Sequence, residues 1–315
     1  MTCGLCAALL WVAHAAEAQN LSFEEIETLP APAADRRIAY GDGPLQFGDL
    51  RLPQGKGLHP VVIMIHGGCW YSAYDLKHVA NFSAALTRTG VATWSLEYRR
   101  VGDAGGGWPG TFEDVARGAD YLRVLARTYP LDLRRVVVVG HSAGGQLALW
   151  LAARQRLPKD SPLYSHDPLP LRGVVSLAGI TDLRGYGPGC GNAVSKLLGG
   201  SPEEMPLRYR QTSPIELLPL RVKQRLIHGL LDKIVPLKQS QDYEVAARRR
   251  GDDVELVIAD EAGHFDLISP QSSTWPAVQE ALRALLQSGG PKKHAAVQNS
   301  HPAVNKTVHA SKPVH

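Results

Sequence analysis

The chain is poor in several residue types, and each scarcity narrows the class of protein. It has four cysteines in 315 residues, and two of them, Cys3 and Cys6, lie within the first 18, so a disulfide framework is excluded. A single bridge between Cys69 and Cys190 stays open, although two thiols outside a Cys-x-x-Cys spacing are more often unpaired. The net charge is only +4 and the basic residues are scattered, so no nucleic-acid partner is indicated.

Long hydrophobic runs are also missing. The apolar run Leu5–Ala13 is shorter than the roughly 20 residues that a membrane-spanning helix needs, and no later segment is longer, so stable membrane insertion is not expected. Ala16-Glu17-Ala18 places small residues where a signal peptidase cuts. The pattern predicts a signal peptide over 1–18 and a secreted or periplasmic protein, although no Lys or Arg precedes the apolar run.

The rest of the sequence has the composition of one large globular domain. Apolar residues make up 44% of the chain, enough for a sizeable core. We expect an extended lead-in over 19–37, because it is polar and contains prolines, then one folded domain over 38–287 and a disordered polar tail over 288–315. The histidines of that tail lack tight spacing, so neither a metal nor another cofactor is predicted.

Short apolar runs alternate with helical patterns, which predicts an α/β fold with a mainly parallel, doubly covered sheet. The Gly- and Pro-rich interval 181–219 predicts a small lid-like insert with one short helical pattern, Asn192–Leu198. The expected strands are Gln46–Leu52, Val61–Ile65, Val91–Tyr98, Val136–Gly140, Gly173–Ala178, Arg225–His228 and Val254–Ala259. The expected helices are Leu76–Arg88, Phe112–Thr128, Ala143–Arg154, Leu237–Arg250 and Trp275–Leu286.

The sharpest chemical signal is Gly140-His141-Ser142-Ala143-Gly144, which lies between a predicted strand and a predicted helix. This is the pattern of a nucleophile elbow, in which small residues let the backbone turn sharply and hold a serine hydroxyl above the sheet. The amide of Ala143 would then point at a negative oxygen formed beside Ser142. We therefore interpret Ser142 as a nucleophile.

A second glycine-rich motif, His66-Gly67-Gly68-Cys69-Trp70, follows the predicted strand Val61–Ile65. Glycines at such a position let backbone N–H groups face a ligand, so the amides of Gly68 and Cys69 are expected to complete an oxyanion hole with Ala143. For His66 we expect a hydrogen bond that holds the loop rather than a catalytic role.

A serine nucleophile needs a base and a group that orients the base. Of the twelve histidines, His264 is the best candidate for the base, because it occupies a loop just after the last predicted strand. Asp232 follows the preceding strand and is the candidate acid, which gives the chain order Ser, Asp, His. Three rivals for the acid also lie near predicted strand ends, namely Asp182, Asp260 and Asp266.

With these motifs, residues Ile38 to Leu286 resemble the α/β-hydrolase superfamily. The pattern is similar to esterases with a His-Gly-Gly oxyanion loop, a group that includes hormone-sensitive-lipase-like esterases, kynurenine formamidases and acetyl and feruloyl esterases. The bulky Trp70 after Cys69 is closer to the formamidase and acetyl or feruloyl esterase pattern than to the three-glycine pattern. The resemblance matches Ser142, Asp232 and His264 to the catalytic triad.

The expected function is a serine carboxylesterase that acts on small, short-acyl esters through an acyl-enzyme. Two alternatives use the same residues, an arylformamidase or other amidase and a peptidase of the prolyl-oligopeptidase type. Trp70, Tyr71 and Trp108 could bind substrate, and packing in the core or lid is an equal alternative for each. The sequence leaves the oligomeric state unknown.

Overall fold

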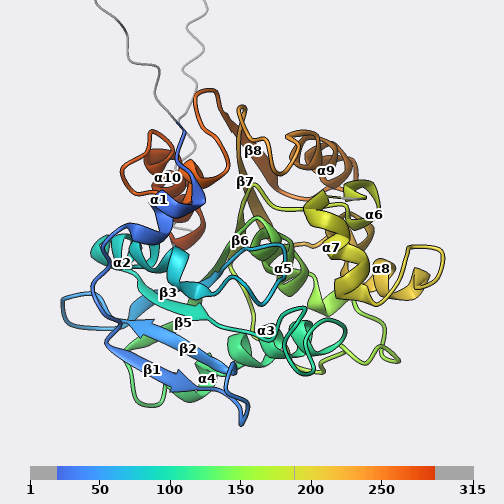
Figure 1. Ribbon diagram of the computed structural model, residues 1–315. Coiled ribbons are helices and arrows are strands. Elements are labelled where there is room, and N and C mark those ends of the chain that lie inside the picture. The colour runs from blue at the N-terminus through green and yellow to red at the C-terminus, as the bar shows by residue number, and fades with distance from the viewer. Residues whose placement is uncertain (1–19, 188, 288–315) are drawn as a thin grey trace, which may run out of the picture.

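A computed structural model describes residues 20–187 and 189–287, which form one mixed sheet covered by helices (Figure 1). Eight strands are found among the described residues, in the order β1-β2-β4-β3-β5-β6-β7-β8. The edge strand β1 pairs antiparallel with β2, β2 pairs antiparallel with β4, and all neighbouring pairs from β4 across to the other edge strand, β8, are parallel. The strands are β1 Arg36–Ala39, β2 Phe47–Arg51, β3 His59–Ile65, β4 Ala92–Leu96, β5 Leu131–His141, β6 Gly173–Leu177, β7 Lys223–Gly229 and β8 Val254–Ala259.

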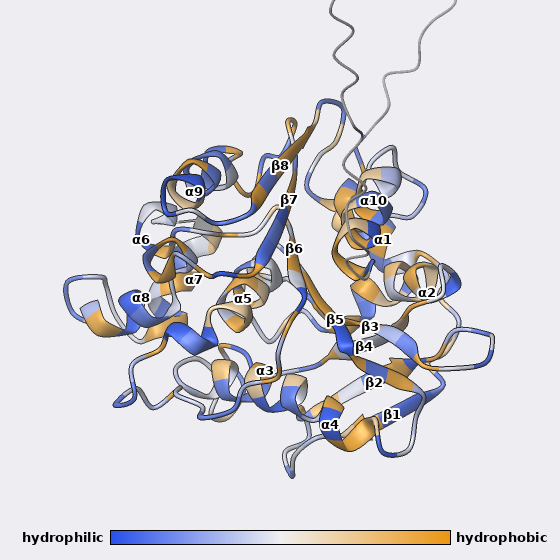
Figure 2. Cartoon of the chain, turned by 180° about the vertical axis from the view of Figure 1, so that it is seen from behind, coloured by the Kyte–Doolittle hydropathy of each residue, from blue (hydrophilic) through white to orange (hydrophobic). Residues whose placement is uncertain are grey.

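The central strands are apolar on both faces, as parallel strands between two helical layers must be. In β3, Val61 and Ile63 pack into one buried cluster while Val62 and Met64 pack into the other, and all four side chains are fully buried. The hydropathy colours show the central strands around β5 and β6 as largely hydrophobic (Figure 2). This arrangement confirms the predicted α/β fold.

Helices flank the sheet on both sides (Figure 1). One face is covered by α1, η1, α2, η4 and α10, and the other by α3, α4, α5, η2, α9 and the insert helices. The first group spans α1 Phe23–Thr28, η1 Leu76–Val79, α2 Ala80–Arg88, η4 Phe265–Ile268 and α10 Trp275–Leu286. The second spans α3 Gly110–Asp120, α4 Leu122–Leu125, α5 Ala143–Ala152, η2 Arg154–Arg156, α6 Leu183–Tyr186, α7 Gly189–Leu198, α8 Pro206–Thr212, η3 Pro214–Leu217 and α9 Lys238–Arg249.

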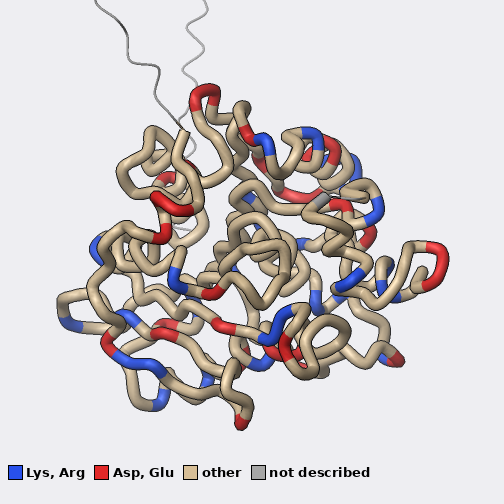
Figure 3. Tube along the Cα trace, viewed as in Figure 1, with Lys and Arg blue, Asp and Glu red and all other residues tan. Residues whose placement is uncertain are grey.

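Charged residues of both signs are interspersed over the outer loops and helices (Figure 3). Within the described ranges, no helix has both the length and the apolar character required to cross a bilayer.

The predicted lead-in over 19–37 is wrong in its conformation. Phe23–Thr28 forms the helix α1, and Arg36–Ala39 begins the sheet as β1. The helix forms because Ser22 and Glu25 make a capping box, in which each side chain accepts a hydrogen bond from the other residue's backbone N–H. The predicted signal peptide 1–18 and tail 288–315 lie outside the described residues, and the insert 181–219 contains α6, α7, α8 and η3.

Candidate active site

Ser142 stands at the sharp turn between β5, which ends at His141, and α5, which begins at Ala143. Its backbone has φ 56° and ψ −122°, a region that a non-glycine residue occupies only when its surroundings hold it there. The amide of Ser142 donates a 2.8 Å hydrogen bond to the carbonyl of Leu177 on β6. A Cβ atom at Gly144 would lie 2.2 Å from the carbonyl oxygen of Ile65, so only glycine permits α5 to pack this closely against β3.

His264 and Asp232 come together from the ends of two neighbouring strands. His264 Nδ1 lies 2.7 Å from Asp232 Oδ2, and the Asp232 side chain is fully buried. The other carboxylate oxygen, Oδ1, accepts hydrogen bonds from the amides of Ile234 and Val235 at 2.8 and 2.9 Å. Burial alone would raise the pKa of Asp232, but hydrogen bonds from His228 and His264 hold it well below its ordinary value. Asp232 is therefore ionised, and His264 donates its Nδ1 proton to it.

His228 supports the Asp232 loop from the end of β7. It is fully buried, donates from Nε2 to the carbonyl of Val235 at 2.9 Å, and accepts at Nδ1 from the hydroxyl of Ser240 at 2.7 Å. Its Nε2 also lies 3.4 Å from Asp232 Oδ2. These contacts fix the carboxylate that faces His264.

The three rival carboxylates have other partners or positions. Asp182 caps the start of α6 by accepting from the amide of Arg184. Asp266 accepts from the amides of Gly263 and Leu21, and Asp260 is exposed to solvent. Asp232 is the carboxylate of this group that contacts the ring of His264.

The oxyanion-loop candidate His66–Trp70 lies directly against the serine turn. A Cβ atom at Gly67 would lie 3.0 Å from Ser142 Cβ, and Gly68 and Cys69 have left-handed φ angles of 100° and 52°. Gly68 has no room for a side chain, because a Cβ atom would lie 2.3 Å from Tyr74 Cβ. Among the hydrogen bonds of the described residues, none uses the amide of Gly68 or Cys69 as donor to a protein group.

A buried ionic network anchors this loop. His66 is fully buried, and its Nε2 lies 3.1 Å from Glu97 Oε1 while its Nδ1 donates to the carbonyl of Gly67 at 2.8 Å. Arg100 lies 3.1 Å from the same Glu97 oxygen. Burial raises the pKa of Glu97, but His66 and Arg100 outweigh burial and lower it, so the carboxylate is ionised. These are the loop-holding contacts that we expect for His66.

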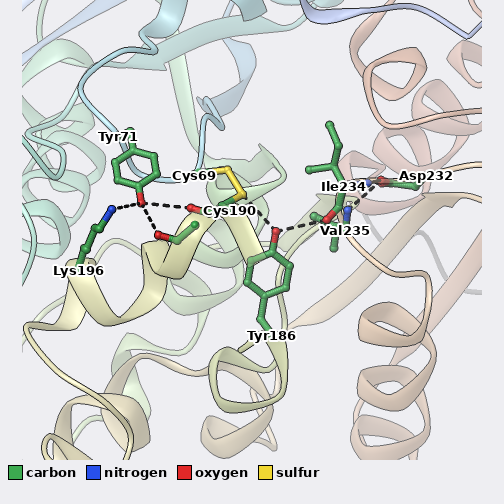
Figure 4. Close-up of a disulfide and its surroundings, with 9 residues drawn as sticks. Cys69, Tyr71, Tyr186, Cys190, Lys196, Asp232, Ile234 and Val235 are labelled. Carbon is green, nitrogen blue, oxygen red and sulfur yellow. Dashed lines mark hydrogen bonds between the residues drawn. A yellow bond between two sulfur atoms is a disulfide. The ribbon is translucent and has the colours of Figure 1, made fainter. Parts of the chain in front are cut away.

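A disulfide joins the loop His66–Trp70 to the insert (Figure 4). Cys69 and Cys190 are bonded, with their Cα atoms 6.0 Å apart, which settles the possibility that the sequence left open. The hydroxyl of Tyr186 lies 3.2 Å from Cys190 Sγ and donates to the carbonyl of Ile234 at 3.3 Å. The insert therefore contacts both the loop that carries Cys69 and the loop that carries Asp232.

Ser142 and His264 line the same cavity, whose volume is about 160 Å³. Both side chains are nearly buried, with residue exposures of 2% and 6%. Gly68 and Cys69 of the loop His66–Trp70 also line it, together with His141. Ala143, the third expected oxyanion donor, is buried in the first turn of α5, where backbone N–H groups have no partner within the helix. The remaining lining residues are Phe23, Glu24, Tyr74, His78, Ile234 and Phe265.

The predicted substrate-binding aromatics lie elsewhere. Trp70 is fully buried, and its Nε1 donates to Gln146 Oε1 at 3.1 Å, so for this residue the substrate prediction is wrong and the core-packing alternative holds. Tyr71 does not line the cavity around Ser142, and its hydroxyl instead bonds the carbonyls of Cys190 and Gly191. Trp108 packs against Phe112, also away from this cavity.

Sequence reasoning missed one whole wall of the cavity. Phe23 and Glu24 come from α1, in the segment that we expect to be an extended lead-in, and Tyr74 and His78 lie in or beside η1. The capping-box residues Ser22 and Glu25 are the local signal that could have located α1. Its position beside the cavity depends on long-range packing and has no local signature.

Comparison with known proteins supports the same fold and family. Residues 49–246 match the BD-FAE family model. The chain belongs to the BD-FAE family. Family membership confirms the resemblance to α/β-hydrolase esterases that the motifs indicated.

Individual relatives are distant. The chain is 25% identical over 253 residues to a probable isoprenylcysteine alpha-carbonyl methylesterase of Oryza sativa, covering 74% of this chain and 57% of the relative. It is 26% identical over 272 residues to the acylamino-acid-releasing enzyme of Rattus norvegicus, covering 78% of this chain and 35% of that protein. This chain thus spans little more than half of the first relative and about a third of the second.

A solved structure shows the shared fold. Esterase B from Lactobacillus rhamnosis superposes with a TM-score of 0.70 at 18% identity, over 81% of this chain and 88% of the esterase. At that identity the likeness concerns the fold. The protein is an α/β-hydrolase whose relatives and structural neighbours are hydrolases, chiefly esterases.

Proposed function

We propose that this protein is a serine carboxylic-ester hydrolase that acts on small esters with short acyl groups. The proposal rests on one observation above all: the Asp232–His264 pair, 2.7 Å apart, opens on the same cavity as Ser142. An ionised carboxylate on Nδ1 keeps the proton there, so the lone pair of His264 lies on Nε2, where a base needs it. The strained turn presents Ser142 as the nucleophile.

In the first step, His264 takes the hydroxyl proton of Ser142 as the serine oxygen attacks the ester carbonyl. The tetrahedral intermediate then collapses, and the protonated His264 gives its proton to the departing alcohol. In the second step, His264 takes a proton from water as the water oxygen attacks the acyl-enzyme carbonyl. The second tetrahedral intermediate then collapses, the bond to the Ser142 oxygen breaks, the acid is released, and His264 returns the proton to Ser142. Asp232 stays ionised and stabilises the imidazolium in both steps.

The negative oxygen of each tetrahedral intermediate is held by backbone amides. We assign this role to Gly68, Cys69 and Ala143, because the first two lie on the loop against the serine turn and the third begins α5. Each such donor typically lowers the barrier by about 3 kcal/mol. The network of His66, Glu97 and Arg100 holds the first two amides in place before substrate arrives.

The preference for short acyl groups follows from the size of the cavity. A volume of about 160 Å³ is close to that of cavities that hold a single benzene-sized ligand. A group of roughly six heavy atoms therefore fits beside Ser142, and this size favours short acyl groups over long lipid chains.

A substrate panel tests the proposed function. Purified protein is assayed with p-nitrophenyl acetate and butyrate, and Ser142→Ala is expected to lower kcat by at least about 10⁴-fold. Ser83→Ala, which removes another buried serine hydroxyl on α2, is the control and is expected to retain activity. Full activity of Ser142→Ala would overturn the assignment.

A second candidate function is cleavage of a C–N bond by the same residues. The similarity to an acylamino-acid-releasing enzyme favours testing it, as does the formamidase-like oxyanion motif. N-formylkynurenine, an N-acetylated dipeptide and a prolyl peptide are compared with p-nitrophenyl acetate. A kcat/KM for any of the three amides above that for the ester would replace the esterase proposal.

We further propose that the protein is exported through the signal peptide 1–18. The Cys69–Cys190 disulfide supports this, because such bonds persist in oxidising compartments. Fractionation of cells that express the full chain tests it, and a protein that stays in the cytosol with residues 1–18 attached contradicts it.

A further inference from the structure

The helix α1 packs beside the loop that carries His264, although more than 200 residues separate the two segments in the sequence (Figure 1). It contacts η1, which carries His78, and η4, which begins just after His264. Its capping box holds the first turn, and Ile26 is buried with only 2% of its surface exposed. The helix therefore packs beside the cavity, and its residues Phe23 and Glu24 line it.

Asp266 ties this helix to the loop of the catalytic base. Its Oδ1 accepts a hydrogen bond from the amide of Leu21 at 3.4 Å, and its Oδ2 accepts from the amide of Gly263 at 2.8 Å. The start of α1 and the residue before His264 therefore share one carboxylate. These two hydrogen bonds link the segment that leads into α1 to the loop that carries His264.

Phe23 projects from α1 into an aromatic cluster at the cavity. Its ring centroid lies 5.1 Å from that of Tyr74 and 5.6 Å from that of His78, both in edge-on geometry. The ring of Phe265 is 5.8 Å away. Such pairs add stability beyond their buried area, so these contacts favour the observed position of the half-buried Phe23 ring.

This wall is uncharged apart from one carboxylate. Burial lowers the pKa of His78 to about 3 and also lowers that of His141 well below its ordinary value, so both imidazoles are neutral at neutral pH. Glu24 lines the cavity with Phe23, and no Lys or Arg is found among the lining residues of the described chain. The cavity therefore favours neutral groups over anionic ones.

From this geometry we propose that Phe23 closes the acyl pocket and sets the upper limit on acyl length, restricting the enzyme to acyl groups of about two to four carbons that carry no negative charge. The inference rests on the proposed function and deepens it, because it assigns the substrate limit to a residue outside the triad and the oxyanion loop. The helix α1 is then a specificity element rather than a connection.

A smaller residue at position 23 should raise the upper limit on acyl length, and a larger residue should lower it. Phe23→Ala removes the ring, and longer chains gain about fourfold in kcat/KM for every methylene that they newly bury. The ratio of hexanoate to acetate turnover is expected to rise by roughly tenfold or more. Phe23→Trp enlarges the wall, and the ratio of butyrate to acetate turnover is expected to fall.

The experiment measures kcat/KM for p-nitrophenyl esters from acetate to octanoate, for the wild type and both variants of the full chain. Phe47→Ala is the matched control, because it removes a half-buried phenyl group on β2 that does not line the cavity. Active sites are titrated with a fluorophosphonate, so a fraction of unfolded protein does not affect the comparison. A second series varies the alcohol of acetate esters from methyl to hexyl.

Opposite shifts of the acyl-length profile in Phe23→Ala and Phe23→Trp, with an unchanged profile in Phe47→Ala, support the proposal. Equal losses on all substrates in both variants would mean that Phe23 only stabilises the fold, and that overturns it. A shift confined to the alcohol series also overturns it, because Phe23 would then contact the leaving group. The proposed function fails separately, if Ser142→Ala keeps its activity.

Discussion

The cavity around Ser142 has two sides that are built by different means. One side consists of the turns that follow the carboxyl ends of β3, β5, β7 and β8. These turns carry the proposed oxyanion loop, Ser142, Asp232 and His264, in that order along the four strands. The other side consists of Phe23 and Glu24 from α1 with Tyr74 and His78 beside η1. Backbone geometry fixes the first side, whereas packing of side chains from distant segments fixes the second.

In the proposed mechanism, the first side carries out the chemistry and the second side sets the substrate preference. Reactive groups at strand ends are positioned by the sheet itself, so they tolerate little variation in backbone position. The α1 side contributes no acid, base or nucleophile to the proposed mechanism, and it shapes the space that a substrate occupies. Substitutions on the first side should therefore change kcat for every substrate, and substitutions on the second should change the order of preference among substrates.

The largest expected effect is on the first side, at Asp232. Asp232→Asn removes the charge that holds the Nδ1 proton of His264, and kcat is expected to fall by about 10³- to 10⁴-fold. The measurement is kcat for p-nitrophenyl acetate. Asp260→Asn is the control, because that rival carboxylate is exposed, and its kcat should stay near that of the wild type. If the two variants have equal activity, Asp232 is not the orienting acid.

The disulfide joins the first side to the insert, and its loss should affect stability and activity together. Cys190→Ser is expected to lower the free energy of unfolding by about 2–4 kcal/mol, and to lower kcat because the Cys69 amide loses its anchor. Denaturant titration and steady-state kinetics measure the two effects. A reducing agent should lower both the free energy of unfolding and kcat of the wild type, and it should change neither in Cys190→Ser. If the reducing agent has an effect of the same size on Cys190→Ser, the disulfide is not the cause.

The neutral His78 on the second side should make the protein sensitive to acid. Its pKa is about 3 in the folded chain, lowered mainly by burial, against about 6.5 for an ordinary imidazole, so unfolding takes up a proton between these values. The contribution of neutral His78 to the free energy of unfolding is therefore fully present above about pH 6.5, and it is lost as the pH decreases toward 3.

His78→Gln should reduce the slope of the free energy of unfolding against pH by about 1 kcal/mol per pH unit between pH 6 and pH 4. The free energy of unfolding is measured at several pH values in that range. His166→Gln, at an exposed histidine, is the control and should keep the wild-type slope. Identical slopes in His78→Gln and the wild type would show that His78 does not drive the acid loss.

The smallest expected effect concerns the charge of Glu24. Glu24→Gln should raise kcat/KM for a monosuccinyl ester relative to an acetyl ester by about twofold to fivefold, and added salt should reduce the difference. Glu27→Gln on the same helix is the matched control, since Glu27 does not line this cavity. An equal change in both variants would indicate a general charge effect and not a local one.

The same division explains what could be predicted from the sequence. The strand Val254–Ala259 was predicted with the bounds that the structure has, and the strand–serine–helix turn follows from local glycines and apolar runs. The strand Arg36–Ala39 was missed because its short polar sequence has no alternation. The bond between Cys69 and Cys190 and the position of Phe23 depend on how the insert and α1 pack, which no local pattern records.

The identity of the nucleophile is tested most directly by covalent labelling. The full chain is treated with a fluorophosphonate, digested, and examined by mass spectrometry for the modified residue. We expect one adduct, on the peptide that contains Ser142, and we expect it to form much more slowly in His264→Ala. An adduct on a different serine, or equal labelling of Ser142→Ala, would contradict this expectation.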